Sequence, residues 1–175
     1  MSPLRHLLSI LLMFALCPFP AIAQDRPHPC DVLDRRTAEA ILGGALRQPV
    51  NGRNRDKHAD RTIAGCMYFS AARSRPRTSI VKLFEYEYSS SQAAKRAFDE
   101  SRSRQLDPPV VWENKPRIGE SAGLWSSEDG LGILILKGNK VLDLQVSRQD
   151  WRNASSLPDL VSDVGARAVS TLASR

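Results

Sequence analysis

The chain is poor in the residues that carry most hydrolytic and metal chemistry. It contains three histidines and three cysteines among 175 residues. Hydrolases of the Ser-His-Asp and Cys-His types need a histidine base. Only His28 and His58 follow the N-terminal segment, and both lie in polar stretches that are typical of loops. We interpret both as solvated surface histidines and expect no enzyme of these two types.

Several motifs with a defined chemistry are also missing. The sequence has no G-x-S-x-G elbow, no H-E-x-x-H pair, no phosphate-binding glycine loop and no calcium loop. It also lacks the close C-x-x-C or H-x-x-x-H pairs on which structural zinc sites usually draw. We therefore expect no cofactor and no metal site, although two thiols and two imidazoles leave a zinc site as the alternative to a disulfide.

Long hydrophobic runs are absent except near the N-terminus, where residues 7–17 are apolar. Arg5 precedes this run, and the small residues Ala21 and Ala23 follow it, as in substrates of signal peptidase. As a helix, the run covers only about half of the ~30 Å hydrocarbon core of a bilayer. It therefore predicts a cleavable signal peptide, with an uncleaved anchor as the alternative.

Cleavage before Gln24 divides the chain into a signal peptide, residues 1–23, and a mature single domain, residues 24–175. The leader removes one arginine, so the formal net charge falls from +6 to +5. Lipid attachment at Cys17 is disfavoured because Leu16 stands where lipoprotein signals carry a small residue. We expect a periplasmic or secreted protein without a transmembrane segment in its mature form.

Two cysteines, Cys30 and Cys66, remain after cleavage. An even number of cysteines in an oxidising compartment is typical of a disulfide. The absence of C-x-x-C argues against a redox function. On the chain-entropy argument, closing this loop stabilises the fold by about 4 kcal/mol.

Three helices are expected from capping residues and apolar periodicity. The first begins after Asp34 and ends at Gly43. The second begins after Ser89, which forms a capping-box signature with Gln92. The third follows Ser156 and carries a continuous apolar stripe.

Alternating or apolar runs predict five strands, at residues 66–70, 78–88, 124–127, 131–137 and 141–147. In the last run, Asp143 and Gln145 alternate with apolar residues, which predicts one dry face and one wet face. The polar stretch 49–61 is interpreted as a loop. The order helix, two strands, helix, three strands, helix predicts an α+β domain with a five-stranded antiparallel sheet covered by helices.

Four short stretches carry a family resemblance: P-C-D-V-L at 29–33, A-I-L-G-G at 40–44, G-C-M-Y at 65–68 and I-G-E-S-A at 118–122. Together they resemble a group of exported bacterial proteins and lipoproteins of unknown function. The resemblance implies a PsbP-like α/β/α sandwich and a non-enzymatic domain that binds or scaffolds. It supplies no catalytic residues, and the chain departs from the lipoproteins in lacking a convincing lipid-attachment cysteine.

Basic residues gather in two segments that are interpreted as loops: Arg53, Arg55, Lys57 and Arg61 in the first, and Arg73, Arg75 and Arg77 in the second. If residues 66–70 and 78–88 form the predicted hairpin, we expect the two clusters at neighbouring ends of the sheet, where they could bind an acidic envelope protein or an anionic envelope component. Nucleic acid is not expected as a partner, because stacking aromatic residues are missing from both clusters. The competing interpretation is that these are solvated loops.

Two alternatives to a binding domain stay open. Glu85 and Glu87 point to one face of a predicted strand about 7 Å apart, close to the carboxylate separation of glycosidases, although any solvent-facing strand end offers the same spacing. A small envelope hydrolase is therefore possible on sequence alone. The other alternative is an inhibitor or immunity protein, although many lytic enzymes are basic like this chain and would repel it.

The three tryptophans are the remaining candidates for recognition, because large amphipathic rings anchor interfaces. They are Trp112, Trp125 and Trp151. We assign Trp125 to the core, where a tryptophan in a strand-rich segment usually lies. The sequence as a whole predicts a non-catalytic exported domain that binds or scaffolds, with its ligand undefined.

Overall fold

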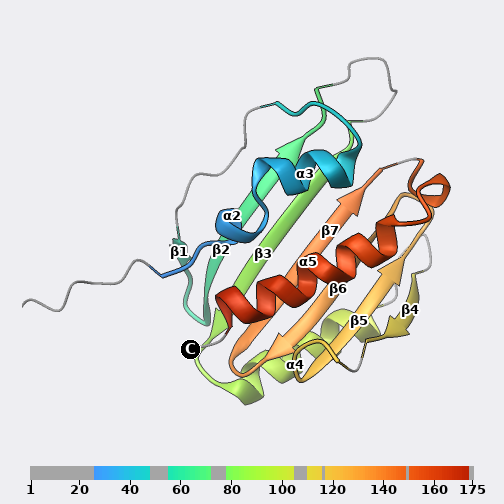
Figure 1. Ribbon diagram of the computed structural model, residues 1–175. Helices are drawn as coiled ribbons and strands as arrows, with labels where there is room; N and C mark the ends of the chain where they lie inside the picture. The colour runs from blue at the N-terminus through green and yellow to red at the C-terminus, as the bar shows by residue number, and fades with distance from the viewer. Residues whose placement is uncertain are drawn as a thin grey trace, which may run out of the picture.

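The computed structural model describes residues 26–47, 55–71, 78–104, 110–115, 117–148 and 150–173. The central feature of this part is a seven-stranded antiparallel sheet with the order β1-β2-β3-β7-β6-β5-β4 (Figure 1). Its strands are β1 (Arg55–Lys57), β2 (Arg61–Phe69), β3 (Ile80–Tyr88), β4 (Val111–Asn114), β5 (Ser121–Ser126), β6 (Gly130–Lys137) and β7 (Lys140–Ser147).

Helices cover both faces of the sheet. On one face lie α2 (Pro29–Val32), α3 (Arg35–Leu42) and α5 (Leu157–Leu172), and on the other lies α4 (Ser91–Ser103) (Figure 1). A short 3-10 helix, η2 (Trp151–Asn153), precedes α5. None of the described helices is long and apolar enough to cross a membrane.

The prediction of an α+β domain with an antiparallel sheet agrees with this architecture, but the five-stranded sheet and its element order are wrong. The strands that the sequence did not indicate are β1 and β4, which form the two edges. Edge strands are commonly short and charged, because a long apolar edge with unpaired backbone groups would pair with other chains. Accordingly β1 reads Arg-Asp-Lys, within a segment predicted to be a loop, and β4 has four residues.

The first predicted helix has the capping residues that its sequence indicated. Asp34 Oδ1 accepts a 2.7 Å hydrogen bond from the Thr37 backbone, and Gly43 ends α3 in a left-handed conformation with φ of 69°. In α4 the capping residue is Ser90, not Ser89, and its hydroxyl accepts from Ala93 N. The predicted boundary was therefore one residue early.

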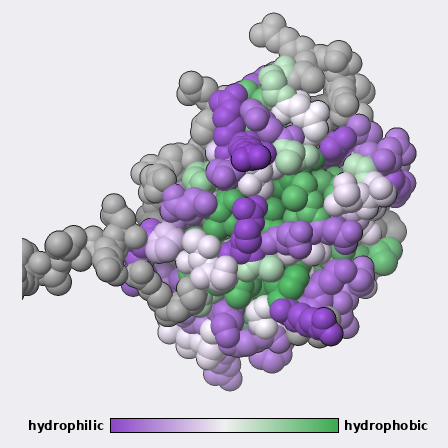
Figure 2. All heavy atoms as spheres, viewed as in Figure 1, coloured by the Kyte–Doolittle hydropathy of each residue, from purple (hydrophilic) through white to green (hydrophobic). Residues whose placement is uncertain are grey.

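The larger apolar core lies between the sheet and α5. Ile133, Ile135, Leu142 and Leu144 of the central strands are at most 1% exposed and pack with α5. Figure 2 shows this side of the molecule, with hydrophilic side chains on the surface and apolar atoms visible between them. The middle strand β6 is buried along almost its whole length, as its apolar sequence indicated.

The predicted disulfide is present and joins α2 to β2. The Cα atoms of Cys30 and Cys66 lie 5.1 Å apart, and Cys66 is fully buried. Because both sulfurs are in the bond, they are not thiolate ligands, so the zinc alternative has lost two of its four ligands. Among the described residues, no group of three or more His, Cys, Asp or Glu side chains could hold a metal ion.

The second, smaller core lies under α4. Ala94 and Phe98 of this helix pack on Leu134, Leu136 and Val141 of the sheet. The helix ends at Ser103. Phe84, Trp112 and Trp125, which lie on the same face of the sheet, are only half-buried.

Candidate functional site

A groove runs along the sheet at the C-terminal end of α4. It consists of two adjoining cavities, of about 270 and 360 Å³, that share five lining residues: Ser101, Arg104, Leu134, Asp143 and Gln145. Trp112 and Trp125 line the first cavity, and Arg61, Tyr86, Tyr88 and Glu100 are among the residues that line the second. We call the two cavities together the α4 groove.

The floor of the groove is formed by β7, the central strand of the sheet. Successive side chains of a strand point to opposite faces, so Leu142 and Leu144 face α5 while Asp143 and Gln145 face α4. Asp143 has Phe84 and Leu134 as its register partners on the two neighbouring strands. A carboxylate thus stands between two apolar residues in the middle of the sheet.

The surroundings of Asp143 disfavour its charged form. Burial raises its pKa to about 6, against the opposing effects of a hydrogen bond from Gln145 and of the Lys82 ammonium. The Gln145 side chain donates this bond from Nε2 to Asp143 Oδ2 over 2.5 Å. The nearby Asp143 charge also adds to the effect of burial on Tyr86, whose pKa is raised to about 12. The charged form of this half-buried carboxylate is therefore destabilised in the folded protein.

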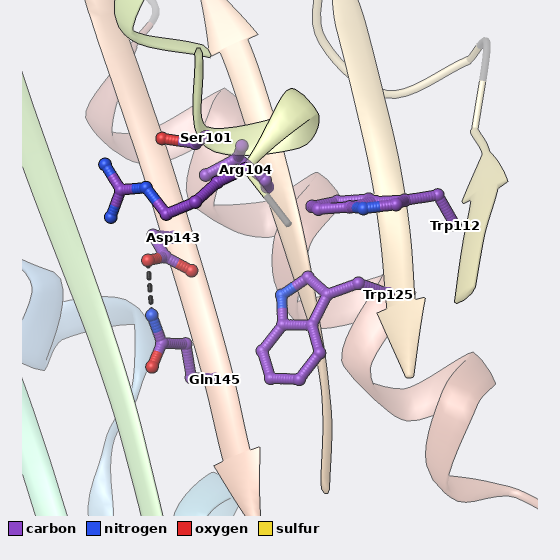
Figure 3. A pocket seen from close by; sticks show the side chains of 7 residues that line it. Ser101, Arg104, Trp112, Trp125, Asp143 and Gln145 are labelled. Carbon is purple, nitrogen blue, oxygen red and sulfur yellow. Dashed lines mark hydrogen bonds between the residues drawn. The ribbon is translucent and has the colours of Figure 1, made fainter. Parts of the chain in front are cut away.

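Two tryptophans form one side of the groove, because glycines on neighbouring strands leave space for their rings. Trp125 lies over its register partner Gly132, where an added Cβ would come 2.7 Å from the indole Cε2. Trp112 lies over Gly123, where an added Cβ would come 2.8 Å from the indole Cε3. In Figure 3 the Trp112 ring is seen edge-on and the Trp125 ring face-on, on the side of the cavity opposite Asp143 and Gln145.

Arg102 holds one of these walls in place. Its guanidinium carbon lies 5.4 Å from the Trp112 ring centroid and 5.7 Å from that of Phe98. Its Nη2 donates a 2.9 Å hydrogen bond to Asn114 Oδ1. Arg102 therefore links the end of α4 to the edge strand β4 and covers one face of the Trp112 ring.

The predicted basic clusters are only partly described. Arg53, Arg73, Arg75 and Arg77 lie outside the described residues, and for Arg55 the structure describes only its place in β1. Lys57 is exposed beside the turn between β1 and β2, and it lines a further cavity of about 250 Å³ together with Arg61.

Arg61 is less a free surface cation than the prediction supposed. It pairs with Asp60 at 3.1 Å, and its guanidinium lies 5.9 Å from the Tyr86 ring centroid. It also lines the α4 groove.

The two clusters were expected at neighbouring ends of the sheet. In the β2–β3 hairpin, Arg61 pairs with Tyr88 at one end, and Phe69 pairs with Ile80 at the other. The second cluster is the segment that follows Phe69. Nine residues of strand extend over about 27 Å. The described part of the first cluster and the residues that flank the second therefore lie at opposite ends of the hairpin.

Glu85 and Glu87 share one face of β3, as predicted, but they do not form an open carboxylate pair. Glu85 is 1% exposed and lies 2.8 Å from the Lys140 ammonium. Glu87 pairs with Arg26 at 3.2 Å. Neither the solvent-facing interpretation nor the catalytic one fits the buried, ion-paired Glu85.

Two other predictions also need correction. His28 is 3% exposed rather than solvated, because its Nδ1 accepts a 3.2 Å hydrogen bond from Cys30 N and caps the start of α2. His58 is exposed, as predicted. Trp125 was assigned to the core, but it is half-buried and lines the groove.

Apart from Arg61, the polar residues that line the groove are not among the candidate site residues predicted from the sequence. The sequence predicts no more than the wet face of a strand for Asp143 and Gln145, and Ser101 and Arg104 lie toward the end of the helix that it predicts after Ser89. The sequence did contain a signal for this polar pair, because Asp143 and Gln145 alternate with the apolar residues of β7. Only the pairing of β7 with both β3 and β6 makes that position central.

No protein-family model and no curated protein sequence matches this chain. Among solved structures, the extracellular domain of PknH from Mycobacterium tuberculosis is similar to it, with a TM-score of 0.44 and 9% sequence identity. The match covers 79% of this chain and 92% of that chain. Likeness at this level carries no statement about ligand or activity.

Proposed function

We propose that this protein is a non-catalytic exported binding domain and that the α4 groove is its ligand site. The disulfide supports export, because such bonds persist in oxidising compartments outside the cytosol. The groove supports binding, because it is concave and brings several polar groups together beside aromatic rings, as small-molecule sites do. The combined cavities are of the size that such sites usually have.

One observation carries the proposal. Asp143 stands half-buried on the central strand, beside Gln145 and opposite two tryptophans, at a position that raises the pKa of its carboxyl to about 6 and so disfavours its charged form. Residues that break the local rules of a fold are most often found where the protein works. A ligand that accepts or donates hydrogen bonds at Asp143 and Gln145 would give this polar pair a function.

Docking through the arginine-rich loops is supported less well. Of the described members of the first cluster, Arg61 is engaged with Asp60 and Tyr86, and it faces the same groove. It therefore belongs with the groove rather than with a separate basic surface. Hydrolysis through Glu85 and Glu87 finds no support in the ion-paired arrangement of these two residues.

A thermal-shift screen of the purified protein against a library of small polar molecules tests the proposal. Ligands that bind the native state raise its melting temperature. We expect the shift caused by a hit to disappear in Asp143→Asn and Trp125→Leu. It should persist in Asp163→Asn, which changes an exposed carboxylate on the opposite helix α5. Equal ligand-induced shifts in all these variants would place the site elsewhere.

A further inference from the structure

The α4 groove has a chemistry that narrows the class of ligand, and the inference below rests on the function proposed above. Three properties of the lining matter: the faces of its aromatic rings, the kind of polar groups beside them, and the balance of charge.

The aromatic wall presents one ring face and one ring edge. Trp125 lies flat against Gly132 on one side, so its other face is turned away from the sheet (Figure 3). Trp112 is seen edge-on in Figure 3, with its Cε3–Cζ3 edge next to Gly123 and the Arg102 guanidinium over one of its faces. Trp125 therefore supplies the stacking surface, and Trp112 supplies a rigid apolar side wall. A flat surface of this kind fits a ring-shaped ligand with an apolar face.

The polar groups opposite this wall are planar and can form paired hydrogen bonds. Asp143 accepts, Gln145 both donates and accepts, and the Arg104 guanidinium donates only. Ser101 adds a hydroxyl from the last turns of α4. Adjacent hydroxyl groups on a ligand both donate and accept, so two neighbouring hydroxyls can bridge a carboxylate and an amide at once.

The charged side chains that line the groove balance one another. Asp143 and Glu100 contribute two carboxylates, and Arg61 and Arg104 contribute two guanidinium groups. A phosphate or carboxylate ligand would be repelled by the two carboxylates, and a quaternary ammonium would be repelled by the two guanidinium groups. Charged ligands of either sign are therefore disfavoured relative to a neutral one, because each would leave like charges unscreened in a partly buried site.

We propose that the α4 groove binds a neutral saccharide, with one sugar ring stacked on Trp125 and its hydroxyl groups hydrogen-bonded to Asp143 and Gln145. The C–H bonds on the less polar face of a sugar carry partial positive charge, and they pack against the negative face of an indole. The second cavity, lined by Tyr86 and Tyr88, continues the groove beyond this ring. It has room for an adjoining unit.

Titration calorimetry and tryptophan fluorescence test the proposal with probes of different class. The neutral probes are maltose, cellobiose, trehalose and chitobiose. The competing probes are choline as a cation, glucose 6-phosphate as an anion and indole as an apolar ring. Each is added up to about 10 mM, which detects a Kd in the millimolar range. We expect at least one neutral disaccharide to bind saturably and to change the tryptophan emission.

The variants locate the binding. Trp125→Leu and Asp143→Asn should each weaken the bound disaccharide by about tenfold or more, while Asp163→Asn should bind as the wild type does. The corresponding polysaccharide is then tested in the same way. A groove that recognises the end of a polymer should bind both the disaccharide and the polysaccharide, whereas a groove for a free sugar should bind the disaccharide alone.

Two results would overturn the inference, and they separate it from the proposed function. One result is that choline, glucose 6-phosphate or indole binds through Asp143 and Trp125 while no disaccharide binds. The groove would then be a site for another class of ligand, and the assignment of a saccharide would be wrong. If no disaccharide binds, and library hits ignore both substitutions, the proposed site fails as well.

Discussion

Lys140 Nζ lies 2.8 Å from Glu85 Oε1 and donates a 2.5 Å hydrogen bond to the carbonyl of Leu172, the last residue of α5. Both side chains are buried, at 11% and 1% exposed. The last carbonyls of a helix have no donor within the helix, so the ammonium serves two acceptors at once. One cation thereby joins β3, β7 and the end of α5.

Replacing this lysine should destabilise the protein strongly. In Lys140→Met, Glu85 keeps its carboxylate but loses the cation, so we expect the free energy of unfolding to fall by about 3–5 kcal/mol. Urea denaturation at neutral pH measures the loss. The double variant Glu85→Met/Lys140→Met should recover most of it, because it removes the buried charge as well as its partner. A double variant no more stable than Lys140→Met would show that the pair is not coupled.

The disulfide should account for a large share of stability. Replacing Cys30 and Cys66 together by serine opens the covalent loop, and we expect a loss of about 4 kcal/mol in the free energy of unfolding. The wild type measured in excess reductant should match this double variant, and the variant itself should not respond to reductant. Unchanged wild-type stability in reductant would contradict the prediction.

Asp143→Asn should make the protein more stable at neutral pH. Because the folded-state pKa of Asp143 is raised to about 6, its contribution to stability is fully present below the unfolded pKa of about 4 and is lost as the pH rises through 6. Asparagine avoids this loss and can still accept the hydrogen bond from Gln145.

We therefore expect Asp143→Asn to exceed the wild type by about 1–2 kcal/mol in the free energy of unfolding at pH 7.5 and to match it below pH 4. Denaturation curves across this range are the measurement, with Asp163→Asn as the exposed control. A gain that is the same at every pH would rule out the titration of Asp143 as its cause.

Gly132→Ala should push Trp125 out of its place. The added methyl group would come 2.7 Å from the indole Cε2 and would also overlap the Leu144 carbonyl oxygen. We expect a loss of about 2 kcal/mol or more and a changed tryptophan emission. Gly44→Ala is the matched control, because no atom lies within 4 Å of its added Cβ. Equal effects of the two substitutions would contradict the close packing of Trp125 and the Leu144 backbone around Gly132.

Local signals in the sequence predicted much of the secondary structure. Asp34 and Gly43 bound α3 as expected, because an N-cap carboxylate and a left-handed glycine act over three or four residues. The apolar run of β6 predicted a buried strand, because both of its faces are covered. The edge strands β1 and β4 escaped notice, because edge strands need neither an apolar face nor length.

The candidate site depends on contacts that no local pattern contains. The sequence around Asp143 is the same whether its face of the strand is exposed to solvent or covered by a helix. That face is covered by α4, which ends forty residues earlier in the chain. Trp125 was placed in the core by its size, yet its ring lies flat because Gly132 faces it across a strand pair. The functional interpretation of the arginines, in turn, assumed a proximity that the hairpin register opposes.

The pairing of β3 with β7 has a consequence for how the chain reaches this structure. Between Ile80 and its partner Ser147 lie α4 and three strands, so the centre of the sheet closes only through a long loop. A nascent chain that ends before β7 has no partner for the β1–β2–β3 group or for the β4–β5–β6 group. Folding dominated by such distant contacts is slow. The unpaired strand edges therefore stay accessible to chaperones and proteases until β7, which ends at residue 147 of 175, has been made.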